Sequence, residues 1–171
     1  MNLFADLLAS TQTPSATSTG PRIQKRRGVE IKSAREIKIM REASRIVATV
    51  LREVMAMVEP GQTTGELDAF AEKRIREMGA TPSFKGYHGF PASICASINN
   101  EVVHGIPNAK RVIHKGDLLK VDTGAYFEGY HGDSCITVCV GESSAEAQTL
   151  SRVAQESLMA GLSQVKAGNT L

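Results

Sequence analysis

The chain has 171 residues, the length of one domain or of a domain with a tail. Its composition, 42% hydrophobic and 22% charged, is typical of a globular protein, and a net charge of +2 is too small to indicate a nucleic-acid partner by itself. No uncharged apolar run approaches the length of a membrane span, and no basic residue precedes the short apolar patch at the start, so neither a membrane anchor nor a secretory signal is expected.

The first 28 residues are predicted to be a disordered leader, ahead of a domain that spans residues 29–171. Residues 9–21 are rich in Ser, Thr and Pro, a composition that does not bury a core. A basic cluster follows, formed by Arg22, Lys25, Arg26 and Arg27. A solvated tail explains this cluster, and a weak electrostatic contact with RNA or a ribosome is the alternative.

Three S/T-x-x-E motifs predict the starts of three helices, at Ser33, Thr63 and Ser143. The first helix should end at Glu59-Pro60-Gly61, the second at Gly79, and the third near Lys166. Apolar residues at helical spacing predict the buried faces. In the first helix these are Ile37, Met40, Ile46, Val47, Val50 and Val54; in the second they are Leu67, Phe70, Ile75 and Met78.

Strands are predicted between the second and third helices. Residues 94–98 have the composition of a buried strand, residues 102–107 that of a short strand stopped by Pro107, and residues 117–140 that of a hairpin with Glu128-Gly129 as its turn. Helices and antiparallel strands in one domain indicate a mixed α/β (α+β) fold.

The hairpin carries two carboxylates, Asp122 and Asp133, where a sheet favours apolar side chains. With the turn at Glu128-Gly129, these aspartates are diagonal neighbours on one face, and the apolar residues point to the other. Two converging carboxylates repel each other unless a cation lies between them, and hard oxygen ligands suit divalent Mn, Mg, Co, Fe or Zn. A solvated sheet edge would explain the same pattern, and a bulge would move one aspartate to the other face.

The histidines and cysteines are less informative. His104 lies in NNEVVHGIP, where Gly105 leaves the backbone open and a polar side chain can be presented. His88 and His131 are further candidates, whereas His114 is predicted to be an exposed linker residue. The three cysteines, Cys95, Cys135 and Cys139, show no CxxC spacing, which favours small core residues in a reducing cytoplasm.

Several segments together resemble the type I methionine aminopeptidases. They are KSAREIKIMREASRIVATVL, GYHGFPASICASIN, SINNEVVHGIP and GDLLKVDTGAYFEGYHGDSCITVCVGE, so the resemblance runs from about Val29 to Leu171. It implies the first half of a pita-bread fold, in which two pseudo-symmetric α/β halves enclose a two-metal centre.

The resemblance also implies roles for individual residues. Asp122 would bind one divalent ion through both oxygens, Asp133 would bridge two ions (Co, Mn, Fe or Zn), and His104 would contact the substrate near the scissile peptide. Tyr87, Phe90 and Cys95 match positions near the pocket for the methionine side chain, with Phe84 as a further candidate. The implied substrate is the N-terminal Met of a nascent polypeptide with a small second residue.

The family takes its other metal ligands, one His and two Glu, from a second half that this chain does not reach, together with a general acid/base Glu and a second substrate histidine. We therefore expect catalysis by these 171 residues alone to be absent or very weak. Three alternatives stay open: a prolidase or Xaa-Pro aminopeptidase relative, a non-catalytic RNA- or ribosome-binding relative, and a short form completed by another chain.

Overall fold

The computed structural model describes residues 30–170, and from Ser33 onward they form one compact unit. The predicted leader and its basic cluster lie outside the described residues. The elements follow in the order α2 (Ala34–Met57), α3 (Thr64–Glu77), β1 (Thr81–Pro82), the 3₁₀ turn η1 (Tyr87–Gly89), β2 (Ile94–Ile98), β3 (Leu118–Phe127), β4 (Tyr130–Cys139) and α4 (Ala145–Ser163).

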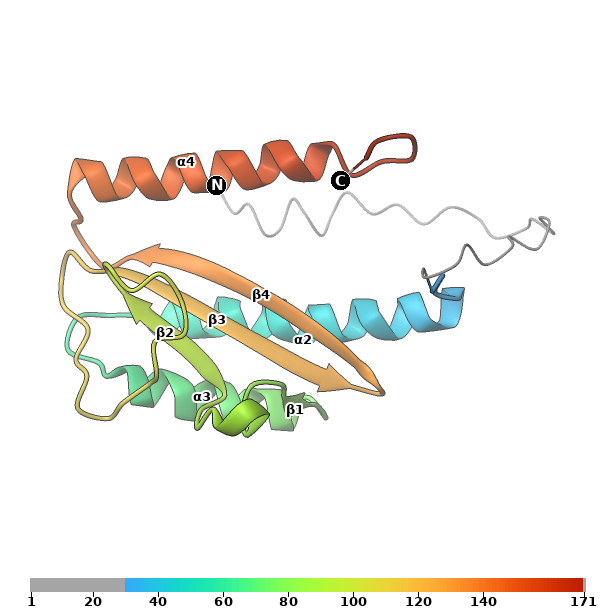
Figure 1. Ribbon diagram of the computed structural model, residues 1–171. Helices are drawn as coiled ribbons and strands as arrows, with labels where there is room; N and C mark the ends of the chain where they lie inside the picture. Colours follow the sequence, from blue (N-terminus) through green and yellow to red (C-terminus); the bar gives the residue numbers. More distant parts are fainter. Residues whose placement is uncertain (1–29, 171) are drawn as a thin grey trace. The chain divides into compact units, whose positions relative to one another are not determined.

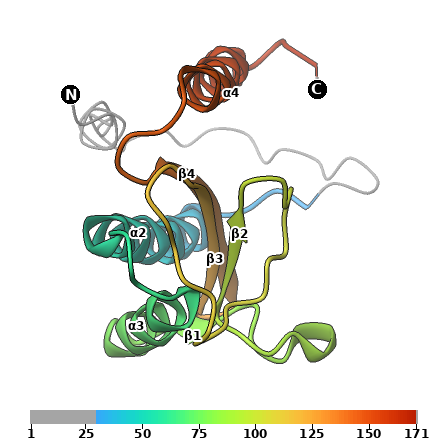
Figure 2. The same cartoon turned by 90° about the vertical axis from the view of Figure 1, so that its left-hand side faces the viewer.

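An antiparallel sheet is built around β3 (Figure 1). One edge of β3 pairs with β2 and, further along, with β1, and the other edge pairs over its whole length with β4. The helices α2 and α3 lie side by side on one face of this sheet (Figure 2). The opposite face of β3 and β4 is therefore free to carry polar side chains.

The core lies between these two helices and the sheet. Its buried side chains include Ile46, Val50 and Val54 of α2, Leu67 and Ile75 of α3, and Ile94, Leu119, Val121 and Ala125 of the sheet. These helix residues confirm the predicted buried faces. Ile37 is an exception and is 48% exposed.

Two of the three predicted helix starts are correct. The Ser33 hydroxyl accepts a hydrogen bond from the Glu36 amide (3.3 Å) while the Glu36 carboxylate accepts one from the Ser33 amide (2.6 Å), and Thr63 and Glu66 repeat the arrangement. The third prediction is wrong by one residue: Ser144, not Ser143, accepts from the Ala147 amide (3.1 Å). That helix, α4, ends at Ser163, and none of its residues is buried.

The predicted strand at residues 102–107 is wrong. The segment belongs to an irregular connection between β2 and β3, and Gly105 within it hydrogen-bonds to β2. His104 has a φ of 61°, in the left-handed region, which interrupts the extended backbone that a strand requires. None of the helices in residues 30–170 is long and apolar enough to span a membrane.

Candidate metal centre

The β3–β4 hairpin has the predicted register, which places both aspartates on the face away from the helices. Gly124 pairs with Asp133 and Asp122 with Cys135, so the two aspartates are diagonal neighbours. Glu128 and Gly129 form the turn with φ values of 45° and 92°, both in the left-handed region that a tight two-residue turn uses. No bulge displaces either aspartate from this face.

Asp122 is the more buried of the two carboxylates, and its electrostatic surroundings are unfavourable. Burial first, and then the neighbouring Asp133, raise the pKa of its carboxyl to about 6, while the His104 imidazole acts in the opposite direction. Its Oδ1 atom is buried without a hydrogen-bond partner among the described residues. A cation next to Asp122 would remove both costs, because it would pair the orphaned oxygen and offset the repulsion from Asp133.

His104 reaches this face because Gly105 holds its loop against β2. The Gly105 amide donates to the Ser97 hydroxyl (3.0 Å), and the Gly105 carbonyl accepts from the Ala96 amide (2.8 Å). A Cβ atom at position 105 would lie 2.4 Å from the Ala96 carbonyl oxygen, so no larger residue fits there. His104 itself remains exposed.

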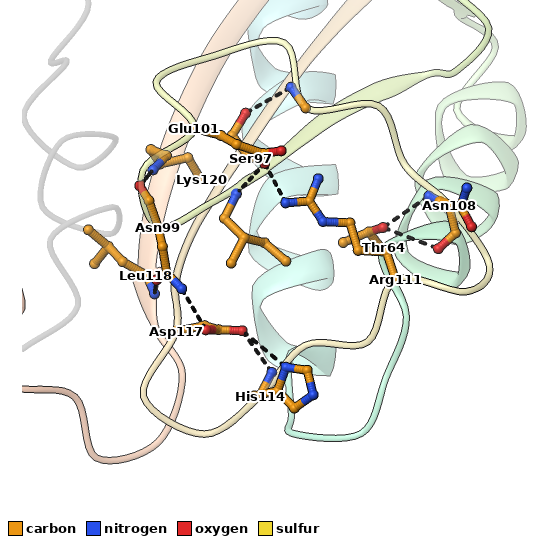
Figure 3. A network of polar contacts seen from close by, with 12 residues as sticks. Thr64, Ser97, Asn99, Glu101, Asn108, Arg111, His114, Asp117, Leu118 and Lys120 are labelled. Carbon is orange, nitrogen blue, oxygen red and sulfur yellow. Dashed lines mark hydrogen bonds and ion pairs between the residues drawn. The ribbon is translucent and has the colours of Figure 1, made fainter.

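Side-chain links on the far side of the same loop keep it in place (Figure 3). Glu101 accepts from the Ile98 backbone amide (2.8 Å) and pairs with Arg111 (2.5 Å), and the Asn99 side-chain amide donates to Asp117 (2.8 Å). The Asn108 amide donates to the Thr64 hydroxyl at the start of α3 (3.0 Å). The long connection is therefore cross-linked at several points, which limits how far His104 can move.

An open pocket of about 820 Å³ lies over the aspartate face. All six residues that the sequence analysis selected line it: Tyr87, Phe90, Cys95, His104, Asp122 and Asp133. The pocket thus has an acidic floor from the hairpin and an aromatic wall from the loop between β1 and β2, so it can hold a cation next to an apolar group.

Comparison with known proteins agrees with this arrangement. The model of metallopeptidase family M24 matches residues 38–171. The chain belongs to this family. It is 49% identical over 150 residues to methionine aminopeptidase 1 of Mycobacterium tuberculosis, covering 88% of this chain and 56% of that protein. It is 50% identical over 140 residues to methionine aminopeptidase 1 of Bacillus subtilis, covering 82% and 56%.

Solved structures show the same relationship. The chain superposes on methionine aminopeptidase from Thermotoga maritima with a TM-score of 0.79 and 36% identity, over 81% of this chain and 55% of that one. The Xaa-Pro dipeptidase of Bacillus anthracis gives 0.71 and 31%, over 82% and 38%. These findings confirm the predicted family and the predicted pita-bread half. The chain spans about half the length of the relatives that it matches.

Membership of a metallopeptidase family implies divalent metal ions, and the donors present fit them. Carboxylate oxygens are ligands that hard and borderline divalent cations accept, and Asp122 offers an oxygen that has no other partner. Residues 30–170, however, contain no group of three or more His, Cys, Asp or Glu side chains placed to hold an ion. Asp122 and Asp133 are therefore the carboxylates that this pocket offers to a divalent ion.

The M24 pocket also includes residues to which the sequence analysis gave no role, among them Ser83, Pro91 and Ile106. No local pattern distinguishes them. His88 and His131, left as open candidates, both line the pocket, whereas His114 is exposed outside it, as predicted.

Asp68 has a structural role that the sequence did not predict. It is half-buried in α3, and its Oδ1 accepts hydrogen bonds from the amides of Ser93 (2.8 Å) and Ile94 (3.0 Å).

One cysteine differs from the prediction of small core residues. Cys95 is buried as predicted, and its burial is the main reason why the pKa of its thiol is raised to about 11. The thiol is therefore uncharged at neutral pH, and this part of the pocket wall is neutral. Cys139 is partly buried. Cys135 is exposed, because it pairs with Asp122 and so shares the polar face of the hairpin.

Proposed function

We propose that these residues supply the acidic floor and the methionine pocket of a methionine aminopeptidase, which removes the initiator methionine from nascent proteins with a small second residue. The observation that carries the proposal is the buried, unpartnered Oδ1 of Asp122 beside Asp133, at the floor of a pocket with an aromatic wall. The M24 relatives with the highest identities quoted above are named methionine aminopeptidases, which supports this activity over that of a prolidase.

The proposed metal centre contains two divalent ions, drawn from Co, Mn, Fe and Zn. Asp122 would bind one ion through both oxygens and Asp133 would bridge the pair. When bound, such ions polarise a water to a hydroxide near neutral pH and can hold the free α-amine of a peptide. The oxygen-only donors of this chain do not select one metal among the four.

The other proposed roles follow from where the side chains lie around the pocket. His104 is exposed at the rim, where its imidazole can donate a hydrogen bond to a substrate carbonyl. Tyr87, Phe90 and Cys95 line the part of the pocket that suits a thioether, because aromatic rings and a neutral thiol are soft, polarisable neighbours. A free N-terminus next to a methionine side chain therefore fits this site.

The proposed partner is the N-terminus of a nascent chain in the cytoplasm. We keep the hypothesis that the basic cluster Arg22, Lys25, Arg26 and Arg27 contacts ribosomal RNA. In the described residues, Lys38, Arg41 and Arg52 are further exposed cations, on the solvent side of α2. Binding to an RNA hairpin that weakens steeply as salt is raised would support it; binding that does not depend on salt would contradict it.

Metal binding tests the proposed centre directly. We would titrate Mn²⁺ into the wild-type chain and into D122N and D133N, and follow the free ion by electron paramagnetic resonance. Glu128→Gln is the matched control, because it neutralises a carboxylate at the turn of the same hairpin, outside the pocket. Loss of binding in D122N and D133N, with binding intact in E128Q, supports the proposal. Equal binding in all four proteins contradicts it.

A further inference from the structure

The aromatic wall of the pocket is a short loop, residues 84–91, whose backbone hydrogen bonds mostly close on itself. The Gly86 amide donates to the Phe90 carbonyl (2.8 Å), the Tyr87 amide to the Phe84 carbonyl (3.0 Å), and the Phe90 amide to the Tyr87 carbonyl (2.9 Å). Such a loop keeps its internal shape, but its position over the aspartate floor depends on what holds its two ends.

The loop is attached to α3 at both ends. Asp68 accepts hydrogen bonds from the Ser93 and Ile94 amides beyond the loop, and Lys85 near its start pairs with Glu72 (2.6 Å), one helical turn further along α3. Ile94 also pairs with β3, so the far end of the wall is fixed to the hairpin as well as to the helical layer. The position of the near end over the carboxylates depends on the residue that precedes the loop.

The near end of the loop is attached to the hairpin by Ser83. The Ser83 amide donates to the Gly124 carbonyl (2.9 Å), and a hydrogen bond of 2.8 Å joins Ser83 Oγ to His131 Nδ1. Gly124 makes this approach possible, because a Cβ there would lie 2.9 Å from the Ser83 Cβ and 3.0 Å from the Phe84 ring. Ser83 and Phe84 thus lie directly on the aspartate face of the sheet.

His131 is the partner on β4. It precedes Asp133 by two residues, so both side chains point to the same face of the strand. Its ring packs against that of Tyr126, with the centroids 4.9 Å apart, and it lines the pocket together with Ser83. The Ser83–His131 hydrogen bond therefore joins the wall of the pocket to the strand that carries one of the floor carboxylates.

We propose that His131 is a positioning residue, which through Ser83 sets the separation between the aromatic wall and the aspartate floor and thereby the size of side chain that the pocket accepts. This inference rests on the proposed function only in naming methionine as that side chain. Without the hydrogen bond, the wall stays attached to α3 but loses its side-chain link to β4, so it should move away from the floor more often.

The test uses four variants of the full chain. Ser83→Ala and His131→Phe each remove the hydrogen bond, and phenylalanine keeps a ring against Tyr126. His131→Asn loses the ring but places an amide near the position of Nδ1, where it can bond to Ser83. The fourth is the double variant S83A/H131F, and His114→Asn is the matched control at an exposed histidine outside the pocket.

Hydrogen–deuterium exchange of the peptide covering residues 84–91 is the first measurement. We expect exchange to be roughly three- to tenfold faster in S83A and H131F, equally fast in the double variant, and close to wild type in H131N and H114N. Exchange at the wild-type rate in S83A, or additive effects in the double variant, would overturn the proposal. If H131F does not fold, the contrast between S83A and H131N decides in the same way.

Binding of L-methioninamide, followed by the chemical shifts of the pocket residues, is the second measurement. Weaker binding in S83A and H131F, with binding recovered in H131N, supports a role of the hydrogen bond in setting the pocket size. Equally weak binding in H131N and H131F would show that the imidazole ring matters and not the hydrogen bond, which would overturn the proposal. If the wild-type chain does not bind this probe, the proposed function fails, while the exchange result still decides whether His131 positions the wall.

Discussion

Asp122 has a carboxyl group that is easier to ionise in the unfolded chain than in the folded one. Burial and the neighbouring Asp133 raise its pKa from 3.8 to about 6. As the pH rises from 3.8 to about 6, the unfolded chain releases this proton first, so the contribution of this carboxyl group to the free energy of unfolding of the metal-free protein falls over that range and is constant above it.

Replacing Asp122 with Asn should therefore stabilise the metal-free protein at neutral pH. We expect a gain of about 1–2 kcal/mol above pH 6, after a discount because solvent screens this half-exposed group, and no gain below pH 3.8. Urea unfolding in the presence of EDTA at several pH values measures it. Excess Mn²⁺ should reverse the order, since the aspartate at position 122 is the better ligand for the ion than the asparagine that replaces it. A variant no more stable than wild type at pH 7.5 would contradict the assigned electrostatic cost.

Gly105 is the residue on which the placement of His104 depends. We expect Gly105→Ala to lower the free energy of unfolding by about 1–3 kcal/mol, because its Cβ would meet the β2 backbone, and to displace the neighbouring histidine. Urea unfolding gives the first effect, and the chemical shift of the His104 imidazole gives the second. An unchanged shift with unchanged stability would show that the loop does not need this close approach.

Some of these residues could be predicted from the chain alone, and others could not. The shared face of Asp122 and Asp133 follows from the two-residue period of a strand and the position of one turn, both of which are local. NNEVVHGIP made His104 a candidate, but its expected role came from the resemblance to a family, and its left-handed backbone was not predicted. The Ser83–His131 contact joins residues 48 positions apart and depends on the fold that brings them together.

At the scale of elements, α2 and β4 approach each other closely. A Cβ at Gly132 would lie 2.5 Å from the Ala43 carbonyl group of α2, so the helix rests directly on the strand at this glycine. Gly132→Ala should push the two layers apart and lower the free energy of unfolding by about 1–3 kcal/mol or more. Thermal and urea unfolding measure the change.

Gly161→Ala is the matched control for both glycine variants. Gly161 lies within α4 and has no atom within 4 Å of its Cβ position, so alanine should stabilise the helix by about 1 kcal/mol or leave the protein unchanged. If G132A and G161A changed the free energy of unfolding by the same amount, the close contact between α2 and β4 would not be important for stability.

Elements with short-range signals were predicted well, and those that depend on distant contacts were not. The caps of α2 and α3 and the hairpin turn are each specified within four residues, and the structure has them. Residues 102–107 have strand-like composition, but they do not form a ladder of backbone hydrogen bonds with β2; Gly105 makes one backbone and one side-chain hydrogen bond to it. Composition alone therefore overestimates how far this segment pairs as a strand. The α4 cap moved by one residue because two adjacent serines can both serve.

At the scale of the whole chain, α4 presents apolar side chains to solvent. Leu150, Leu158 and Leu162 are 61%, 61% and 46% exposed, and their spacing places them on one side of the helix. We expect the chain to self-associate through this face as concentration rises. In sedimentation velocity, L158Q/L162Q should shift the species toward the 18.4 kDa monomer, whereas Ser157→Ala on the same helix should not. A wild-type chain that stays monomeric at all concentrations would contradict this expectation.

The number of candidate ligands also limits the chemistry expected of this chain. On the proposed function Asp122 and Asp133 supply two ligands, and residues 30–170 contain no larger group of His, Cys, Asp or Glu placed to hold an ion. Two monoanionic ligands would leave most coordination positions of two ions to water, so the ions should bind weakly. With Mn²⁺ or Co²⁺ and a Met-Gly peptide, we therefore expect the 171-residue chain to give turnover no faster than its D122N variant. Release of methionine measures it, and an Xaa-Pro peptide assayed in parallel separates the prolidase alternative. Turnover at an ordinary enzymatic rate, lost in D122N, would mean that a second copy or another segment of the chain completes the site.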